Sequence, residues 1–493
     1  MPDERFELVR IASLKTVDNF RSHLAGLKLE LPCDERLESG AGSPLARPVE
    51  SVRINGKTIG NRFAVHPMEG WDGTDAGGIT EEMLRRWARF GQSGAKLICG
   101  GEAMAVRADG RANPRQLIIS EENKADLARL RETLVAAHRE RHGNTDDLVI
   151  GFQLTHSGRF CRPNGKTLEP RVAYRHPLLD RKFKVESDDL VLSDAEVREL
   201  IQCYVRAARV AWDCGADFVD LKHCHGYLLH EFLSAFTRPG DYGGCFANRT
   251  RILREIVEGI RAGGNKIELA VRLSAFDTVP FKPDPTRAQA GKLGPGIPDD
   301  FPLPYPYAFG ANPDNPLEYD LTETFQFMQL CHELGIKILS LSAGSPYYVP
   351  HIQRPAAYPP CDGYQPAHDP LIDVVRQIDV VRQLKAQAPP GMVLIGAAYS
   401  YLQEFLPQVG QAVVREGWTD MIGLGRMILS YPNLVAETLA GGLQTPKLIC
   451  RTFSECTTAP RNGMISGCYP LDPYYAAKPE AKKLKEIKKA SGA

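Results

Sequence analysis

The chain has 493 residues, a hydrophobic fraction of 43% and a formal net charge of zero. This length suits one large barrel or two to three ordinary domains, and the apolar content is sufficient for a well-filled core. No basic tract runs through the chain, which argues against binding to nucleic acid or to an acidic membrane surface. No apolar stretch approaches the length of a membrane span.

The N-terminus carries charges at Asp3, Glu4 and Arg5 and lacks the apolar core of a signal peptide. Twelve cysteines are scattered along the chain without a repeating frame. We therefore expect reduced thiols in a cytoplasmic protein. The lysine-rich segment 478–489 predicts a solvated, frayed helix near the C-terminus.

Residues 1–50 show no strong period and are expected to form an N-terminal extension, with a short helix between Val17 and Leu29. A repeating alternation of strands and helices begins at Asn61. Eight apolar runs read as strands buried on both faces. They span residues 61–66, 95–99, 148–154, 217–222, 266–273, 336–342, 392–398 and 420–425.

Helical patterns follow these strands. A capping box at Ser193 and Glu196 predicts the start of one helix, which continues with apolar residues at helical spacing as far as Ala211. The other helices are expected at residues 80–91, 121–141, 248–261, 322–334, 371–388 and 401–416, with a last helix after 425.

Eight strand–helix units predict an α/β fold, a (β/α)8 TIM barrel, over residues 51–445. A doubly wound open sheet is the competing fold, but it would place a Gly-x-Gly-x-x-Gly turn after the first strand, and residues 66–70 provide none. Residues 278–320 are dense in proline and predict an inserted loop rather than an extra sheet. Residues 446–493 are expected to form a C-terminal tail.

The stretch from Phe218 to Gly244 is the most informative one. An apolar run stops abruptly at Lys222, and the chain continues with two histidines, a cysteine, a glycine and Tyr227. In parallel α/β folds the carboxyl ends of the strands form the ligand-binding edge. A polar loop with hydrogen-bonded histidines remains the alternative for this stretch.

In a barrel, the residues just past each strand face one common site. These residues are Pro67, Met68, Glu69, Glu102, Ala103, Gln153, His156, Lys222, His225, Tyr227, Arg272, Ser342, Gly344, Ala398, Ser400, Gly423, Gly425 and Arg426. The last two loops contain small residues and an arginine, a composition typical of phosphate binding. Tight packing would also explain Gly423 and Gly425, and a salt bridge at a helix start would also explain Arg426.

A phosphate site beside an amide, a guanidinium and few carboxylates indicates a flat anionic cofactor. His223 and His225 are two residues apart on one strand face, but no third ligand with metal-site spacing is evident. The sequence therefore disfavours a metal site.

Several of these motifs together resemble the Old Yellow Enzyme family, in particular its NADH:flavin oxidoreductase and dienoyl-CoA reductase branch. The resemblance covers about Asn61 to Leu434, with a weaker echo to about Pro473. The motifs that carry it are NRFAVHPM, QLTHSGR, DLKHCHGYLLHEFLS, DYGG, VRLS and IGLGRMILSYPNL. It implies an FMN-binding barrel that takes electrons from NAD(P)H.

The resemblance also implies roles for individual residues. Arg272 would lie near the N1/O2 edge of the flavin, Lys222 and His225 would hold a substrate carbonyl, and Tyr227 would donate a proton. Pro67, Met68, Glu69, Ala103 and Gln153 would lie along the isoalloxazine. Ala398, Tyr399, Ser400, Gly423, Gly425 and Arg426 would form the phosphate side.

The chain departs from the family pattern at two of these positions. Histidine is usual where Lys222 stands, and an ion pair with a nearby acid is the structural alternative for this lysine. A small or hydroxyl residue is usual where Glu69 stands; its carboxylate would either oppose flavin reduction or point away.

Long family members carry a four-cysteine iron–sulfur motif and a further nucleotide-binding part. Here only Cys450, Cys456 and Cys468 follow the barrel, whereas a cubane iron–sulfur cluster requires four thiolate ligands. We expect a degenerate motif without a cluster, and electrons that reach the flavin directly from NAD(P)H.

The sequence therefore predicts an FMN-dependent oxidoreductase that reduces the activated alkene of a small molecule, such as an enone, an enoate or an enoyl thioester. An FMN-dependent amine dehydrogenase or demethylase is one alternative. A barrel that has lost catalysis and serves as a binding protein is the other. Homo-oligomerisation stays open, and the insert is a candidate lid or subunit contact.

Overall fold

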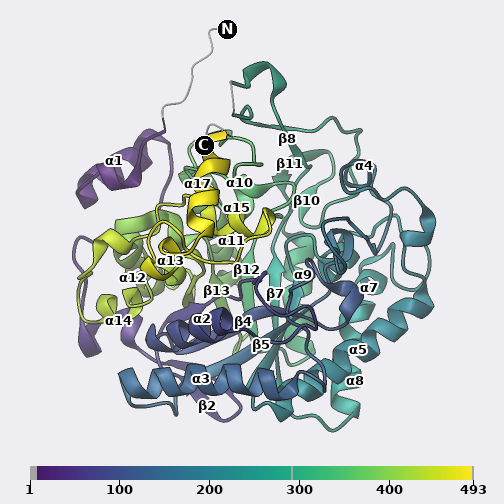
Figure 1. Cartoon of the computed structure of the whole chain (residues 1–493), viewed down its shortest axis with the longest axis horizontal. Helices are drawn as coiled ribbons and strands as arrows, with labels where there is room; N and C mark the ends of the chain where they lie inside the picture. Colours follow the sequence, from purple (N-terminus) through teal and green to yellow (C-terminus); the bar gives the residue numbers. More distant parts are fainter. Residues whose placement is uncertain (1–7, 290–291, 491–493) are drawn as a thin grey trace.

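The computed structural model describes residues 8–289 and 292–490. The N-terminal charges at Asp3, Glu4 and Arg5 lie outside this range. Eight parallel strands close into a barrel in chain order, from β3 through β4, β5, β6, β7, β12 and β13 to β14, which pairs with β3. Figure 1 shows these strands at the centre of the molecule with helices around them. The predicted (β/α)8 barrel is confirmed.

The barrel strands begin one or two residues after their predicted starts and have almost entirely buried side chains. Their bounds are β3 Phe63–Val65, β4 Leu97–Ala105, β5 Val149–Thr155, β6 Phe218–His223, β7 Glu268–Ser274, β12 Ile338–Ser342, β13 Val393–Gly396 and β14 Met421–Leu424. β4 is longer than predicted because Gly100 and Gly101 adopt positive φ angles, and a register shift lets the strand continue past them.

The helices around the barrel follow the predicted order. They are α2 Glu81–Gln92, α3 Lys124–His142, α5 Asp194–Asp213, α9 Thr322–Glu333 and α11 Leu371–Ala386. The capping box that opens α5 is present, with Ser193 and Glu196 exchanging hydrogen bonds.

Three predicted helices are interrupted. The segment after β6 contains α6 Leu228–Leu233, α7 Phe246–Arg249 and α8 Arg251–Ala262. The predicted helix 401–416 is a 3₁₀ segment, Tyr399–Phe405, followed by α12 Leu406–Arg415. The last predicted helix is split into α13 Arg426–Ser430 and α14 Leu434–Leu439.

An antiparallel hairpin that the sequence did not reveal lies at the amino end of the barrel. It consists of β1 Val49–Ile54 and β2 Lys57–Ile59. Its apolar residues Val49, Ile54 and Ile59 form one buried cluster with residues of the barrel strands, among them Phe218. The hairpin therefore covers the barrel interior at the end opposite to the carboxyl ends of the strands.

The proline-rich insert 278–320 is more ordered than predicted. It contains two small antiparallel sheets, β8 Phe281–Pro283 with β9 Gly296–Pro298, and β10 Ala311–Asn312 with β11 Asn315–Tyr319. The prediction of a loop without a sheet was wrong because prolines at the ends of short two-stranded ribbons leave the remaining pairing intact.

Both ends of the described chain pack against the rest of the protein. The predicted short helix near the N-terminus is α1 Val17–Gly26, and its Phe20 stacks on Phe405 with ring centroids 4.4 Å apart. Near the C-terminus, α15 Glu455–Arg461, α16 Pro473–Ala476 and α17 Glu480–Ala490 form a small cluster of their own (Figure 1, yellow). Most residues of the final helix, α17, are exposed, as expected of a solvated helix, but Leu484 anchors one face of it in that cluster.

Candidate active site

A cavity of about 950 Å³ opens at the carboxyl ends of the barrel strands. All of the predicted site residues except Tyr399 line it. They are Pro67, Met68, Glu69, Ala103, Gln153, Lys222, His225, Tyr227, Arg272, Ala398, Ser400, Gly423, Gly425 and Arg426. The structure thus brings residues that follow different barrel strands in the sequence together in one cavity.

Tyr399 does not reach the cavity. Its ring is fully buried in the main core, behind the loop that carries Ala398 and Ser400. Adjacent residues on an irregular loop point in different directions, so proximity in sequence did not imply a common orientation. Three further strand-end residues also lie outside the cavity lining. Glu102 pairs with Arg86, His156 is enclosed beside Gly110, and the Gly344 carbonyl accepts from the Ser274 hydroxyl.

The middle of the cavity floor is formed by an amide and a guanidinium. Gln153 donates its side-chain N–H to Asp220 over 2.8 Å, which fixes the orientation of the amide. Burial raises the pKa of Asp220 to about 6, although Gln153 and Arg272 act in the opposite direction. Arg272 donates from Nη1 to the Pro67 carbonyl over 3.3 Å, and its buried Nε has no partner within the described chain.

One side of the floor has the features of an anion site. Arg426 donates from Nη2 to the Pro355 carbonyl over 2.9 Å, while its buried Nη1 has no partner in residues 8–289 and 292–490. Ala398 adopts a left-handed backbone conformation, with φ of 70°. A side chain at Gly425 would meet only the sulfur of Met68 at 3.8 Å, so space is open above its backbone.

Gly423 has a different role from Gly425. A Cβ atom at this position would lie 2.0 Å from Nε2 of His66. The close packing that the sequence left as an alternative therefore explains Gly423, whereas Gly425 leaves room for a ligand.

On the other side of the floor, a cation lies over a phenol ring. Lys222 Nζ is 3.2 Å from the centroid of the Tyr227 ring. Lys222 is 5% exposed, and it forms no ion pair with any residue that the structure describes. Burial lowers the pKa of Lys222, and the charge of Glu69 partly opposes this effect. The ion pair that would have given Lys222 a purely structural role is thus not formed within the described chain.

His225 is held beside this pair by serine hydroxyls. Its backbone, with φ of 66°, donates to Ser274 Oγ over 2.9 Å, and its ring Nε2 lies 2.9 Å from Ser342 Oγ. Burial lowers the pKa of His225 well below its ordinary value, and Arg272 and Lys222 add to the effect. His225 is therefore a neutral imidazole, and Lys222 is the cation of the pair.

Glu69 does not point away from the site, and it forms no ion pair with a cation among the described residues. Its Oε2 accepts the Tyr227 hydroxyl proton over 2.7 Å, and its Oε1 accepts from Trp71 Nε1 over 3.1 Å. Burial raises the pKa of Tyr227 well above its ordinary value, and the charge of Glu69 adds to it. A second phenol, Tyr347, lies 3.0 Å from the Tyr227 hydroxyl.

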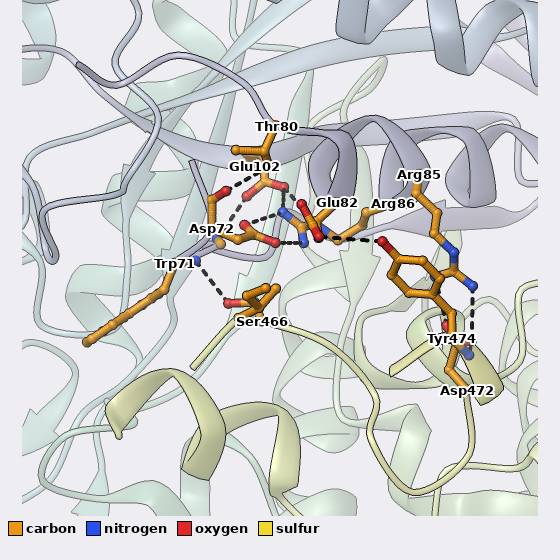
Figure 2. A network of polar contacts seen from close by, with 12 residues as sticks. Trp71, Asp72, Thr80, Glu82, Arg85, Arg86, Glu102, Ser466, Asp472 and Tyr474 are labelled. Carbon is orange, nitrogen blue, oxygen red and sulfur yellow. Dashed lines mark hydrogen bonds and ion pairs between the residues drawn. The ribbon is translucent and has the colours of Figure 1, made fainter. Parts of the chain in front are cut away.

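The C-terminal tail completes the cavity wall with Cys456, Thr457, Pro460, Arg461, Ser466 and Gly467. Figure 2 shows how the tail is attached. The Ser466 hydroxyl accepts from the Trp71 backbone N–H over 2.9 Å, and the Asp472 carboxylate accepts from Nη1 and Nη2 of Arg85. In the same view Arg86 lies between Asp72 and Glu102. No pattern in the sequence indicates that the tail returns to the site.

Tyr347 was also missed. It lies in the loop after β12, where the same reasoning from strand ends could have found it, and it stacks on Phe160 with ring centroids 3.9 Å apart.

The tail cysteines were expected to hold no cluster. In the described part of the chain no three potential ligands are grouped so that they could hold a metal ion. No helix there is long and apolar enough to cross a membrane.

Comparison with known proteins finds similarity to flavin oxidoreductases. The family described as NADH:flavin oxidoreductase / NADH oxidase matches residues 49–291. A relative, the NADPH dehydrogenase of Geobacillus sp. (strain WCH70), is 31% identical over 236 residues, which cover 46% of this chain and 63% of the relative. The chain thus spans less than two thirds of the length of this relative. The family is described by NADH and a flavin and the relative by NADPH, in agreement with the expected FMN and NAD(P)H.

Solved structures share the fold. The 2-naphthoyl-CoA reductase in complex with 2-naphthoyl-CoA has a TM-score of 0.64 at 18% identity, with 89% of this chain and 58% of the other covered. The Old Yellow Enzyme homologue from Zymomonas mobilis has a TM-score of 0.52 at 21% identity, with 82% and 98% covered. Residues 49–291 of this chain are therefore similar to the NADH:flavin oxidoreductase / NADH oxidase family, in agreement with the resemblance to Old Yellow Enzymes.

Proposed function

We propose that the protein is an FMN-dependent oxidoreductase that uses NAD(P)H to reduce an activated alkene next to a carbonyl. The observation that carries the proposal is the group of Lys222, His225 and Tyr227 in one cavity with Gln153 and Arg272. A cation and a polar imidazole can stabilise negative charge on a substrate oxygen, and a phenol can supply a proton.

The cavity residues fit FMN. Arg426, with an unpaired buried nitrogen, would hold the phosphate beside Ala398, Ser400 and Gly425. Pro67, Met68, Ala103, Gln153 and Arg272 would lie along the ring system. Bound FMN would supply hydride chemistry, which no side chain provides.

Lys222 and His225 would bind the substrate carbonyl and stabilise the enolate charge as it develops. The ammonium of Lys222 is buried and unpaired among the described residues, so its field is stronger than that of a solvated lysine. Tyr227 would deliver the proton to the α-carbon. Its raised pKa keeps the phenol protonated at neutral pH.

The same geometry disfavours the amine-dehydrogenase alternative. A protonated amine would enter a cavity whose floor carries the Lys222 and Arg272 cations, with desolvation strengthening the repulsion. The substrate class that fits is a neutral or anionic carbonyl compound.

The experiment begins with the visible spectrum of the purified protein, after FMN is supplied if it is colourless. Anaerobic addition of NADPH or NADH should bleach the flavin, and a cyclic enone should then restore its colour. A protein unable to take up FMN would contradict the enzyme proposal. A flavin bleached by an amine but not by either nicotinamide would support the oxidative alternative.

Tyr227→Phe separates the two half-reactions. We expect slower reoxidation by the enone, by about 10²-fold or more, and unchanged reduction by NAD(P)H. Tyr204→Phe is the matched control, because Tyr204 is buried in α5 and does not line the cavity. Enone turnover that is unchanged in Tyr227→Phe would remove Tyr227 from this role.

A further inference from the structure

Tyr227 belongs to a chain of hydrogen-bonding groups that the family resemblance does not explain. Its hydroxyl lies 2.7 Å from Glu69 Oε2 and 3.0 Å from the Tyr347 hydroxyl. The other oxygen of Glu69 accepts from Trp71 Nε1 over 3.1 Å. All four side chains line the cavity.

Counting protons shows why Glu69 matters. A phenol has one proton to donate, and an ionised carboxylate can only accept. While Glu69 is ionised, the Tyr227 proton is committed to Glu69, and Tyr347 donates to the Tyr227 oxygen. Tyr227 then has no proton directed at a substrate.

Protonation of Glu69 reverses this bond. The carboxylic acid donates to the Tyr227 oxygen, and the Tyr227 proton becomes free to point into the cavity. The state of one carboxyl therefore decides whether the phenol can act as an acid.

We propose that Glu69 is a positioning residue that gates proton delivery by Tyr227. This inference rests on the proposed alkene reduction. When hydride bonds to the β-carbon, the π electron pair of the alkene takes the Tyr227 proton at the α-carbon. The Glu69 proton moves to the Tyr227 oxygen at the same time, and the Glu69 carboxylate left behind regains a proton from water in the cavity.

Charged side chains surround Tyr227, Glu69 and Tyr347. Lys222 of β6 faces Glu69 and Tyr227, and Arg162 and Arg461 act on Tyr347. Burial raises the pKa of both phenols, so they stay protonated across the neutral range.

Trp71 makes the substitution Glu69→Gln a well-defined test. The indole N–H selects the amide oxygen of glutamine, which turns the amide nitrogen toward Tyr227. The variant E69Q therefore mimics the protonated state at every pH. Glu416→Gln is the matched control, the same change at the end of α12 and outside the cavity.

The first measurement is the rate at which 2-cyclohexenone reoxidises the photoreduced enzyme, followed anaerobically as a function of pH. For wild type and E416Q we expect the rate to fall with rising pH, by about tenfold per pH unit once Glu69 is mostly ionised. For E69Q we expect a rate that stays flat over the same range. Reduction by NAD(P)H should not distinguish the variants.

The second measurement does not depend on turnover. Infrared difference spectra of wild type minus E69Q should show the C=O stretch of one neutral carboxyl that disappears on the same pH profile as the rate. A shared pH profile for wild type and E69Q, or the absence of that band throughout, would overturn the gate. An enone that reoxidises neither protein at any pH would overturn the proposed function instead.

Discussion

Lys222 Nζ lies 3.2 Å from the centre of the Tyr227 ring, and both residues are buried at the cavity floor. An ammonium over an aromatic face is stabilised by the ring quadrupole without neutralisation of its charge. The aromatic ring thus holds the lysine in place while its positive charge remains available to a substrate oxygen. This arrangement explains how lysine can stand where the family usually has histidine.

Replacing Lys222 by methionine keeps the length of the side chain and removes the charge. We expect the rate of enone reduction to fall by about 10²–10³-fold, the effect of losing one donor at a developing oxyanion. Flavin reduction by NAD(P)H should change much less. Stopped-flow measurement of both half-reactions checks this, with Lys337→Met at the barrel's amino end as the control. Equal losses in both half-reactions would indicate that Lys222 maintains the structure of the site rather than binds the substrate.

Arg426→Met tests the anion site. A charge-assisted hydrogen bond contributes about 1.5–3 kcal/mol, so the Kd for FMN should rise by about 10–100-fold. Quenching of flavin fluorescence during titration of the apoprotein measures this directly. Arg415→Met is the control, because Arg415 pairs with Asp34 and Glu38 outside the cavity. An unchanged Kd would assign Arg426 only to its bond with the Pro355 carbonyl.

The barrel could be predicted because its strands are buried on both faces and separated by amphipathic helices. The hairpin at Val49–Ile59 could not, since three to six residues of mixed polarity carry little periodic signal. The insert ribbons were missed for a related reason: proline density argued against pairing, whereas the prolines stand at ribbon ends such as Pro283 and Pro298.

The cavity floor could be predicted because position after a parallel strand determines which edge a residue occupies. Orientation within an irregular loop could not, as Tyr399 shows by turning into the core. The hydrogen bond from Tyr227 to Glu69 joins segments 158 residues apart in sequence, and Ser466 reaches Trp71 across 395. Such contacts depend on tertiary packing, which has no local pattern in the sequence.

The buried guanidinium of Arg86 offers a test of stability. It donates to Asp72 over 2.7 and 2.9 Å and to Glu102 over 2.8 Å (Figure 2). Arg86→Met leaves two buried carboxylates without their counter-ion, so the free energy of unfolding should fall by about 3–5 kcal/mol. Urea unfolding monitored by circular dichroism measures this loss.

Arg85→Met is the matched control for that experiment. Arg85 lies next to Arg86 on α2, but it is partly exposed and pairs with Asp472 of the tail. We expect a loss of about 1 kcal/mol. Equal losses in the two variants would show that the Arg86 cluster contributes no more than the pair of Arg85 with Asp472, a carboxylate that also has Arg89 within 3.6 Å.

The stability of the site segment should also depend on pH through His230. Its ring is 1% exposed, Nδ1 accepts from the Gly226 backbone over 2.9 Å, and burial, with a smaller effect from His223, lowers the pKa of His230 to about 3. Because this folded-state pKa lies below the unfolded value of about 6.5, the contribution to stability is complete above that value and is lost as the pH falls toward 3. Between about pH 7 and about pH 5 the loss in the free energy of unfolding from this one group should be about 2 kcal/mol.

His230→Asn keeps an acceptor for Gly226 and does not titrate, so the free energy of unfolding of this variant should fall by about 2 kcal/mol less than that of the wild type over the same range. Urea unfolding of both proteins at the two pH values provides the comparison, in which His223 affects both equally; identical losses would mean that His230 stays uncharged in the unfolded chain or is already protonated in the folded one.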